Sequence, residues 1–404
     1  MVDLSGVIRP GDGIMWGQAC AEAQTLVEAV VEQRASFSGA RVFTGMSFSG
    51  ILKPEHADHL RLSSYCGTGT NRALAEASVL DIYPAPYSQL GALIRDGHIK
   101  TDVVLLQVAP PNSRGEYSLG LGVEFLAPGI KTARAVIAEV NDRVPWTHTE
   151  PLLSRQDFSF MVKSSRAPVY MPTRVGEVEN AIARHVAELI PDGAVLECGI
   201  GNLPTAILGL LGNRRSLRFH SGVVPDGVAD LAQRGIIEDE IHGGGLMGTQ
   251  FLFDWASNNA LLRLHSSDYT HSASVLSALA RFVAINSAVE VDLVGQVNGE
   301  VAKGIYVGAV GGALDFVRAA NRSPGGVSII ALPAVAGTES RIVARLSGPV
   351  SIPATEAGVV ATEYGLADLR GASVGERCRR MIAVAAPAHR EALEGQARTL
   401  GLLR

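Results

Sequence analysis

Cysteine is scarce in this 404-residue sequence, and no two cysteines lie close together. The four cysteines are Cys20, Cys66, Cys198 and Cys378. Their separation excludes the CxxC spacing of zinc and dithiol sites, and their pattern does not suggest a disulfide framework. We therefore interpret them as reduced thiols in the core, and we expect no metal site.

Long apolar runs and basic stripes are also lacking. No apolar run reaches the length of about 18 residues that a membrane-spanning helix needs. The formal net charge is −5, with lysine and arginine interspersed along the chain, which argues against nucleic acid as a partner. The first residues, MVDLSGVIRPGDG, lack the charged start and apolar core of a signal peptide. We therefore expect a cytoplasmic protein that binds neither nucleic acid nor membrane.

The sequence does contain enough apolar residues for a sizeable core. Hydrophobic residues make up 47% of the 404 residues, and this length exceeds what one core usually holds. Short apolar runs alternate with helical stretches, which is typical of α/β folds with helices on both faces of a sheet. The expected strands are Val103–Val108, Ala135–Val140, Ala194–Glu197, Phe282–Ile285 and Val327–Leu332. The expected helices are Cys20–Gln33, Glu177–Leu189, Thr205–Leu211 and Asp226–Arg234.

The segment 145–173 has several prolines and no clear period, and it predicts a link between two domains. We place the boundary near Arg174, which gives domains 1–174 and 175–404. Gly193 precedes a strand-to-loop passage like the one that follows Gly11, and this favours duplication of a common α/β unit.

Glycine-rich loops carry most of the chemical information. In LECGIGNLPTAIL, a strand runs into Gly199 and Gly201, and a helix is expected to begin near Pro204. Backbone N–H groups at such a helix start can hold an oxyanion or a phosphate, although a tight connection without a ligand has the same pattern. The loop is not a P-loop, because no Gly-Lys-Ser/Thr follows it.

Two further loops have the same character. GAVGGALDFVRAA places Gly311 and Gly312 before an expected helix, where paired glycines would let a ligand approach the backbone. A plain turn before a helix is the alternative. VVATEYGLADLRG places Glu363 and Tyr364 between a strand and Gly365. A helix-capping acid followed by a core tyrosine is the alternative there.

Two acids occur close together in AINSAVEVDLVGQV. In a strand, Glu290 and Asp292 would share one face, while the apolar residues between them take the other. Neighbouring carboxylates in an apolar setting repel, so at least one needs a partner or a raised pKa. A catalytic role and structural pairing with an arginine both stay open.

An ordered set of segments covers most of the chain: VAPPNSRGEYSLGLG (108–122), VIAEVND (136–142), GIGNLPTAIL (199–208), DGVADL (226–231), INSAVEVDLVGQV (285–297), VGGALDF (310–316) and TEYGLADLRG (362–371). Together they resemble the acetyl-CoA hydrolase/transferase family. That family includes 4-hydroxybutyrate and succinyl-CoA:acetate CoA-transferases and lies within the class I CoA-transferase superfamily.

The resemblance implies two related CoA-transferase-like domains with open α/β sheets and an active site at their junction, with acyl-CoA bound mainly by the second. In the family, a glutamate attacks the thioester and forms an acyl-glutamyl anhydride and then a glutamyl-CoA thioester. A CoA thioester is then the substrate, no cofactor is tightly bound, and the assembly is a homodimer or larger. The implied oxyanion and CoA-binding residues are Gly199, Ile200, Gly201, Asn202, Gly311, Gly312 and Gly365.

The chain departs from the family at the nucleophile. The family's glutamate follows the first glycine loop, in a strand that ends His-Ser-Glu or Tyr-Thr-Glu before an Asp-Gly helix start. Here the corresponding positions are His220, Ser221 and Gly222, ahead of Asp226 and Gly227. The sequence therefore predicts that Gly222 replaces the glutamate and that the standard relay cannot run through this position.

Four explanations stay open. The first is hydrolysis, of a thioester or of a β-keto carbon–carbon bond, by a water in the space left at Gly222; superfamily hydrolases that lack this glutamate are a fold-level analogy. The second is a CoA-transferase that uses a relocated carboxylate. The third is a catalytically silent binder of CoA thioesters. The fourth is a shifted alignment that gives the role to Glu238 or Glu240.

We favour the first explanation. Glu290 is our preferred general base, because a low dielectric could tune a carboxylate toward neutral pH. His220 could also act as a base, and a buried, hydrogen-bonded histidine is the alternative. Glu124, in GLGVEFL, and Glu363 are reserve candidates.

Overall fold

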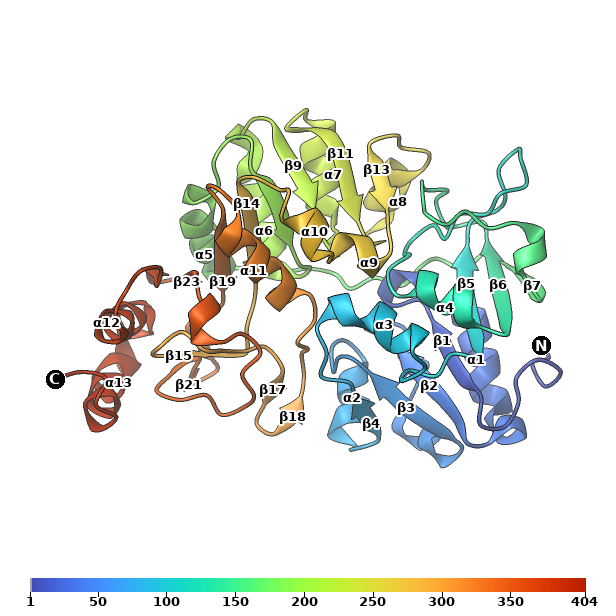
Figure 1. Ribbon diagram of the computed structural model, residues 1–404, viewed down its shortest axis with the longest axis horizontal. Coiled ribbons are helices and arrows are strands. Elements are labelled where there is room, and N and C mark those ends of the chain that lie inside the picture. The colour runs from blue at the N-terminus through green and yellow to red at the C-terminus, as the bar shows by residue number, and fades with distance from the viewer. Residues whose placement is uncertain (1) are drawn as a thin grey trace. The chain divides into compact units, whose positions relative to one another are not determined.

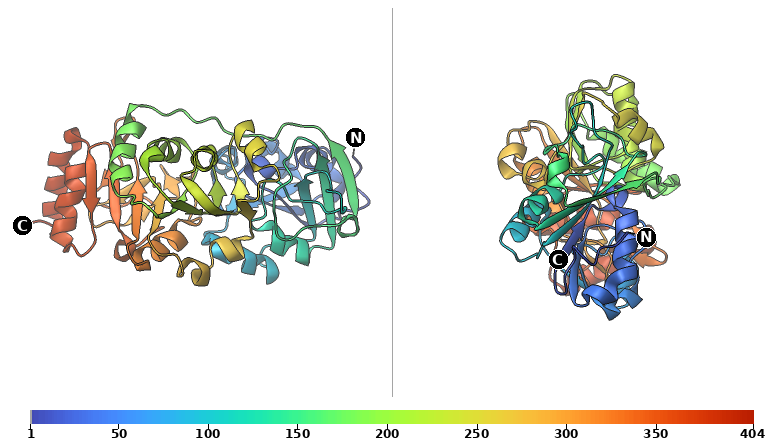
Figure 2. Two further views of the ribbon diagram at one scale, coloured as in Figure 1. Left: turned by 90° about the horizontal axis from the view of Figure 1, so that it is seen from above. Right: turned by 90° about the vertical axis from the view of Figure 1, so that its right-hand side faces the viewer.

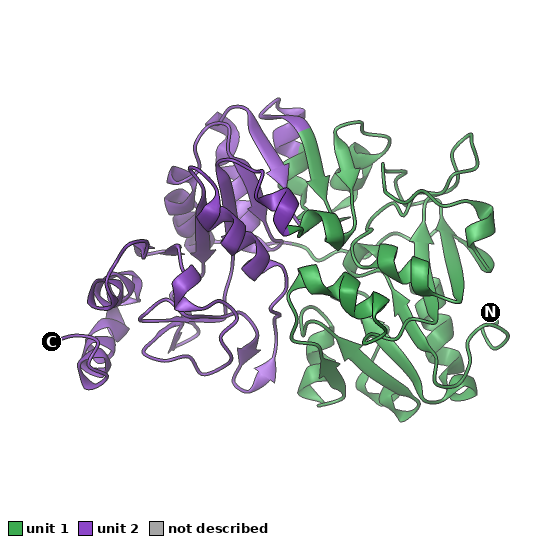
Figure 3. Ribbon diagram, in the orientation of Figure 1, with its two compact units in different colours: residues 1–172, 222–229, 240–272 green, residues 173–221, 230–239, 273–404 purple. Residues whose placement is uncertain are grey.

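A computed structural model describes residues 2–404, which form two compact units (Figure 1). Figure 3 shows unit 1 in green and unit 2 in purple. The chain first passes from unit 1 to unit 2 after Pro172, close to the predicted boundary at Arg174, and two later segments belong to unit 1. Unit 1 comprises the residues up to Pro172 with Gly222–Ala229 and Glu240–Ser272, and unit 2 comprises Thr173–Ser221, Asp230–Asp239 and Ala273–Arg404.

Unit 1 is built on a parallel seven-stranded sheet with the order β4-β3-β2-β1-β5-β6-β7. Its central strands are continuous buried runs, because helices cover both faces. Trp16 and Leu105 join Leu26 of α1 in one core, whereas α4 packs on the opposite face against Met15. The strands are β1 (Gly13–Trp16), β2 (Ala40–Thr44), β3 (Leu60–Ser64), β4 (Leu80–Ile82), β5 (Val103–Val108), β6 (Ala135–Asn141) and β7 (Phe160–Ser164).

The other elements of unit 1 are mostly short. The helices are α1 (Gln24–Gln33), α2 (Asn71–Glu76), α3 (Leu90–Arg95), α4 (Leu126–Thr132), α8 (Gln250–Ala256) and α9 (Ser267–Thr270), with the 3-10 turns η1 (Ala19–Ala21) and η4 (Tyr87–Gln89). The remaining strands are β10 (Val223–Val224), β12 (Gly245–Leu246) and β13 (Leu262–Leu264). Two elements run from one unit into the other: α7 (Asp226–Gln233) and β11 (Ile237–Gly243).

Two sequence predictions for unit 1 need correction. The segment 145–173 is more than a link, because it contains β7, which pairs with β6 as the edge strand. This strand was hard to recognise because it is short and only partly buried. The helix expected to start at Cys20 begins at Gln24, since Ala19 has a φ of 50° and the chain forms a 3-10 turn before the helix.

Unit 2 contributes the consecutive strands β9-β8-β14-β19-β23-β24 to an eight-stranded sheet, and among these strands only the pair β23-β24 is antiparallel. The strands predicted at 194–197, 282–285 and 327–332 are confirmed as β8, β14 and β19 within a residue at each end. The strands are β8 (Val195–Cys198), β9 (Leu217–His220), β14 (Phe282–Asn286), β15 (Glu290–Asp292), β16 (Val297–Asn298), β17 (Val301–Ala302), β18 (Ile305–Tyr306), β19 (Val327–Ala331), β20 (Val335–Ala336), β21 (Glu339–Ser340), β22 (Ile342–Val343), β23 (Val359–Thr362) and β24 (Gly365–Asp368).

Helices cover both faces of this sheet as well (Figure 2). Helices α5 and α6 pack together on one face, and α10 and α11 pack on the other, where Phe316 of α11 meets Phe282 of β14. At the end of the chain, α12 and α13 pack side by side next to β24. The helices are α5 (Glu177–Glu188), α6 (Asn202–Gly209), α10 (Ala273–Leu276), α11 (Ala313–Arg322), α12 (Val374–Val384) and α13 (Pro387–Thr399).

The two sheets share a plan, which confirms the expected α/β fold. The strand order reverses between β1 and β5 in unit 1 and between β8 and β14 in unit 2. Gly11 and Gly193, with φ of 78° and 70°, form left-handed turns shortly before β1 and β8. Ligands of open α/β sheets bind outside the carboxyl ends of the strands at such a switch point. The loops after β1, β5, β8 and β14 are therefore where each unit is expected to carry its chemistry.

Candidate active site

The switch point of unit 1 holds a buried cluster of polar side chains. Gln18 follows β1, Tyr65 follows β3, and Tyr87 lies in η4. The Gln18 Nε2 donates to Oε1 of Glu124 at 2.6 Å and to the hydroxyl of Tyr87 at 3.0 Å. Segments far apart in the sequence are thus brought together around one carboxyl group, that of Glu124.

Glu124 is one of the acids that the sequence proposes as candidates, and it is only 2% exposed. Burial raises the pKa of Glu124 to about 7, although hydrogen bonds from Gln18 and Tyr87 oppose the shift. A carboxyl group that titrates near neutral pH can take up a proton and release it again during one reaction cycle.

Glycines also contact this carboxyl group. Cβ atoms added at Gly244 and Gly245 would lie 3.2 and 3.3 Å from side-chain carbons of Glu124. The N–H groups of the same two glycines donate to the carbonyl of Gly222, at 3.0 and 3.2 Å. Glu124 therefore packs against the backbone that holds Gly222, the position where the sequence predicts a missing acid.

The backbone of Glu124 is strained. Its φ of 40° lies in the left-handed region, which costs a non-glycine residue about 1–3 kcal/mol. Hydrogen bonds from the Glu124 N–H to the His265 carbonyl and from the Ser267 N–H to the Glu124 carbonyl hold this conformation, at 3.3 and 3.1 Å. Strain of this kind is concentrated at active sites and ligand clamps.

The first glycine loop lies at the switch point of unit 2, between β8 and α6. Helix α6 begins at Asn202, earlier than predicted, and Gly201 precedes it with a φ of 107°, which glycine adopts without strain. Cβ atoms added at Gly199 or Gly201 would meet nothing within 4 Å. The Asn202 side chain accepts a hydrogen bond from the N–H of Arg174 at 2.9 Å. The loop has open backbone, as an oxyanion site requires, and that role for Gly199, Ile200 and Gly201 stays a prediction.

Sequence reasoning missed a second buried acid, just before this loop. Glu197 lies on β8 and accepts a hydrogen bond from Asn286 Nδ2 at 2.8 Å. Burial raises the pKa of Glu197 to about 8. The available signal was a glutamate inside an otherwise apolar buried strand, because such a residue must find a partner or stay protonated.

Glu290 lies on β15, which confirms the predicted strand. Its Oε1 accepts hydrogen bonds from Asn298 Nδ2 at 3.0 Å and from the N–H and hydroxyl of Ser347 at 2.6 and 2.8 Å. Asp292 accepts from the N–H of Val294 and from the N–H and side chain of Gln296. These partners are amides and a hydroxyl, whereas the alternative left open by the sequence was structural pairing with an arginine. Both acids tie loops of unit 2 together, and catalysis by Glu290 stays a prediction.

Glu363 and Tyr364 form the turn of the β23-β24 hairpin, so no helix follows for Glu363 to cap. The Glu363 side chain accepts from the N–H of Ala334 at 2.8 Å. Tyr364 is 45% exposed and faces the guanidinium of Arg390, 5.7 Å from the ring centre, so the core-tyrosine alternative is wrong. Gly365 has a φ of 133°, which explains glycine at the turn.

The remaining candidates lie near strand and helix ends. Gly311, with a φ of 54°, and Gly312 precede α11, which confirms the helix expected there. His220 is the last residue of β9 and is buried. The hydroxyl of Ser221 donates to the carbonyl of Cys198 at 2.9 Å. Catalytic and CoA-binding roles for these residues stay predictions.

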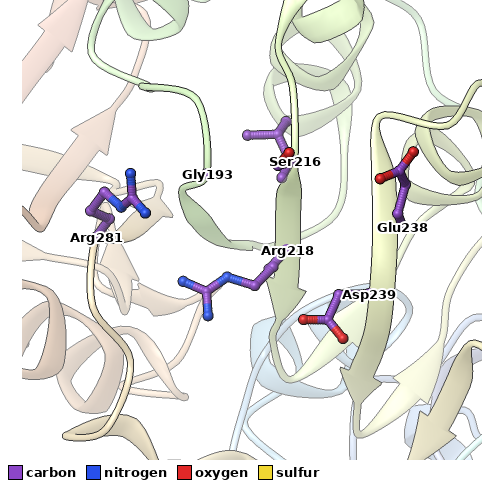
Figure 4. A pocket seen from close by; sticks show the side chains of 7 residues that line it. Gly193, Ser216, Arg218, Glu238, Asp239 and Arg281 are labelled. Carbon is purple, nitrogen blue, oxygen red and sulfur yellow. The ribbon is translucent and has the colours of Figure 1, made fainter.

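A pocket of about 460 Å³ lies in unit 2 (Figure 4). Arg218 and Arg281 lie on one side of it, and Glu238 and Asp239 lie on the other. Because Gly193 and Arg281 come just before strands β8 and β14, the pocket opens at the amino ends of the strands. This is the edge opposite to the one where open α/β sheets bind substrates, so we assign no catalytic role to it.

Residues 2–404 show neither a cluster of metal-ligating side chains nor a membrane-spanning helix. Among these residues, no group of three or more His, Cys, Asp or Glu side chains is placed to hold a metal ion. None of the helices they form has the length and apolar character of a membrane span.

The chain is similar to a known protein family and to curated proteins over most of its length. Residues 2–154 match the model of the acetyl-CoA hydrolase/transferase N-terminal domain, and residues 248–397 match that of the C-terminal domain. A 4-hydroxybutyrate coenzyme A transferase from Clostridium kluyveri is 34% identical over 395 residues, which cover 94% of this chain and 92% of the relative. An acetyl-CoA hydrolase from Kluyveromyces lactis is 27% identical over 245 residues, 55% of this chain and 46% of the relative.

The chain is also similar to solved structures over nearly its whole length. The crystal structure of RipA from Yersinia pestis superposes with a TM-score of 0.94 at 29% identity, covering 99% of this chain and 96% of RipA. The similarity therefore extends over both units, including the segments of unit 1 that follow Gly222.

Proposed function

Because the chain belongs to the acetyl-CoA hydrolase/transferase family, we propose that it hydrolyses an acyl-CoA thioester with Glu124 as the general base. The observation that carries the proposal is the position of Glu124, a buried carboxyl group of pKa about 7 that packs against the backbone holding Gly222. Glu124 replaces Glu290 as the preferred base, because Glu124 packs against the backbone that holds Gly222, whereas Oε1 of Glu290 accepts three hydrogen bonds from Asn298 and Ser347.

The reaction needs one water and one carboxylate. Ionised Glu124 takes a proton from a water beside Gly222, and the resulting hydroxide adds to the carbonyl carbon of the thioester. When the tetrahedral intermediate collapses, the C–S bond breaks, and protonated Glu124 gives its proton to the departing CoA thiolate. The products are a carboxylic acid and CoA, and Glu124 is again ionised.

The same base would serve a β-keto thioester. In that case the hydroxide adds to the keto carbon, and the adjacent carbon–carbon bond breaks with the electrons held as the thioester enolate, which is then protonated by Glu124. In both reactions a negative charge develops on an oxygen atom, and backbone N–H groups such as those of the Gly199–Gly201 loop are suited to stabilise it.

A panel of acyl-CoAs, including β-keto thioesters, tests the proposal in water enriched in oxygen-18. We expect, without added acceptor, thiol release from a hydrolysed thioester or a shortened acyl-CoA from a cleaved β-keto thioester. Oxygen-18 should appear in the acid product, and mass spectrometry should find no covalent adduct on the intact protein. Glu124→Gln should abolish turnover. The matched control is Glu76→Gln, which changes an exposed carboxylate of α2 that pairs only with Arg72.

Two other outcomes would contradict hydrolysis. A glutamyl-CoA adduct that maps to a glutamate, together with turnover that requires an acceptor carboxylate and ping-pong kinetics, would indicate a CoA-transferase with a relocated acid. Binding of acyl-CoA without product or adduct across the panel would indicate a catalytically silent binder.

A further inference from the structure

Gln18 uses both ends of its side-chain amide at the switch point of unit 1. Its Oε1 accepts hydrogen bonds from the hydroxyl of Tyr65 at 2.8 Å and from the N–H of Met46 at 3.0 Å. Its Nε2 donates to Glu124 at 2.6 Å and to the hydroxyl of Tyr87 at 3.0 Å. Gln18 lies two positions after Trp16, the last residue of β1.

The partners of the oxygen fix which way the amide points. The N–H of Met46 belongs to the main chain and can only donate, so it requires an acceptor. If the amide rotated by half a turn, its NH₂ group would face this N–H, and its oxygen would face the carboxyl oxygen of Glu124. The observed orientation is therefore the one that presents a donor to Glu124.

The backbone at Gly45 packs closely against the Gln18 side chain. A Cβ atom added at Gly45 would lie 2.3 Å from Oε1 and 2.6 Å from Cβ of Gln18. The N–H of Ala19 donates to the carbonyl of Met46 at 2.7 Å, which ties the loop after β1 to the loop after β2. The Gln18 side chain is 3% exposed, so water does not compete for its hydrogen bonds.

We propose that Gln18 is a positioning residue that holds the Glu124 carboxyl in one orientation and favours its ionised form, with Tyr65 and the main chain of Met46 fixing the amide. A hydrogen bond from an uncharged amide stabilises a carboxylate more than it stabilises a carboxylic acid. The proposal rests on the proposed function, since it concerns the residue to which that function assigns the proton transfer.

Other titratable side chains lie near Glu124. Tyr87 from η4, Tyr65 from the loop after β3 and Cys20 from η1 face it, and burial raises the pKa of all three, that of Cys20 to about 12. The negative charges of the nearby acids Glu22 and Asp226 also raise the pKa of Cys20. Glu124 is the titratable group of this cluster that accepts directly from the Gln18 amide, and His271, whose ring centroid lies 4.7 Å from that of Tyr87, is a further titratable side chain beside it.

The test compares pH profiles of kcat/KM. Gln18→Met keeps the shape of the side chain and removes its donor, so we expect the acidic limb of the profile to move up by about one pH unit. At a pH below the limb, kcat/KM should fall about tenfold, and at high pH most of the activity should return. Tyr65→Phe removes one of the two donors that fix the amide oxygen, so it should loosen the amide and shift the limb in the same direction by less.

Tyr83→Phe is the matched control, because it also removes a tyrosine hydroxyl from unit 1, one that donates to the carbonyl of His98. It should leave the profile unchanged. An unshifted acidic limb in both Gln18→Met and Tyr65→Phe would overturn the proposal, and Tyr65→Phe keeps the test decisive if Gln18→Met does not fold.

A second readout does not depend on activity. The pH dependence of the unfolding free energy, compared between Glu124→Gln and the unchanged protein, reports the pKa of Glu124. The same comparison between Gln18→Met and the double variant Gln18→Met/Glu124→Gln reports the pKa of Glu124 when the amide is absent. A higher value in the second pair supports the proposal, and equal values overturn it. If Glu124→Gln retains turnover, the proposed function fails, and this readout still decides the role of Gln18.

Discussion

The two switch points of the molecule carry the same pair of groups and differ in what surrounds it. In unit 1, the amide of Gln18 donates to the buried carboxyl of Glu124; in unit 2, the amide of Asn286 donates to that of Glu197. Glu124 is also hydrogen-bonded to a tyrosine and contacts glycine backbone, whereas Glu197 lies within a strand just ahead of a loop of bare backbone. The switch point of unit 1 is therefore rich in polar side chains, whereas that of unit 2 presents open backbone.

The largest effect should come from the acid of unit 1. Glu124→Gln removes the proposed general base and should lower kcat/KM about 10²–10⁴-fold. Glu197→Gln should cost far less, because burial keeps Glu197 protonated at pH 7 and an amide resembles a neutral acid. Steady-state kinetics of the two variants at pH 7 measure this. Equal losses would mean that the two switch points do not differ in function.

Gly244→Ala should have the next largest effect. Its Cβ atom would lie 2.6 Å from the carbonyl oxygen of Gly222 and 3.2 Å from Cγ of Glu124, so both must move. Misplacement of a catalytic group by about 1 Å can cost about 10²-fold in rate, and overpacking costs about 1–3 kcal/mol in unfolding free energy.

Kinetics and denaturant unfolding of Gly244→Ala check both numbers. The control is Gly209→Ala in α6, where an added Cβ atom would meet nothing within 4 Å. A Gly244→Ala variant as active and stable as this control would refute the packing that we describe around Glu124.

The two carboxyl groups should also make stability depend on pH. Burial raises the pKa of Glu124 to about 7 and that of Glu197 to about 8, from an ordinary value of 4.5. Below pH 4.5 both states hold the proton; above it the unfolded chain releases the proton while the folded chain keeps it, so stability falls until the folded group ionises. The contribution of Glu124 should decline by about 3 kcal/mol up to pH 7, and that of Glu197 by about 5 kcal/mol up to pH 8.

Urea unfolding from pH 4 to 9 measures these declines. Glu124→Gln and Glu197→Gln should each remove one of them, so that the slope of unfolding free energy against pH becomes flatter over a different window in each variant. Parallel curves for the variants and the unchanged protein would contradict the raised pKa values.

The smallest effect should come from Glu290→Gln. The amide keeps an oxygen that can accept from Asn298 and Ser347, so we expect a loss of about 1 kcal/mol in unfolding free energy and little change in kcat/KM. Thermal unfolding and steady-state kinetics check this. Loss of turnover with an intact fold would restore Glu290 as the general base.

The strands could be predicted because their signal is local. All six residues of β5 are buried, so a continuous apolar run marks it in the sequence, whereas β7 is half-buried at an edge and its pattern is weak. The glycine loops were recognisable for a similar reason, since a strand, a glycine and a helix start follow one another along the chain.

The environment of Glu124 could not be predicted, because no local pattern encodes it. Gln18 lies 106 positions before Glu124, and the glycines that contact the carboxyl group lie about 120 positions after it. A carboxyl group acquires a pKa near 7 only through such distant neighbours, so the sequence could nominate Glu124 but could not rank it above Glu290.

The run Gly243-Gly244-Gly245 should resist substitution during evolution. None of the three glycines has a positive φ, so backbone conformation does not demand glycine there. Added Cβ atoms would instead lie 2.4 Å from Val224, 2.6 Å from Gly222 and 3.1 Å from Leu121, respectively. Every missense change of a glycine codon adds at least this atom, so drift at these positions should be suppressed in any lineage that keeps Val224 and the backbone of Gly222 and Leu121 in their present places.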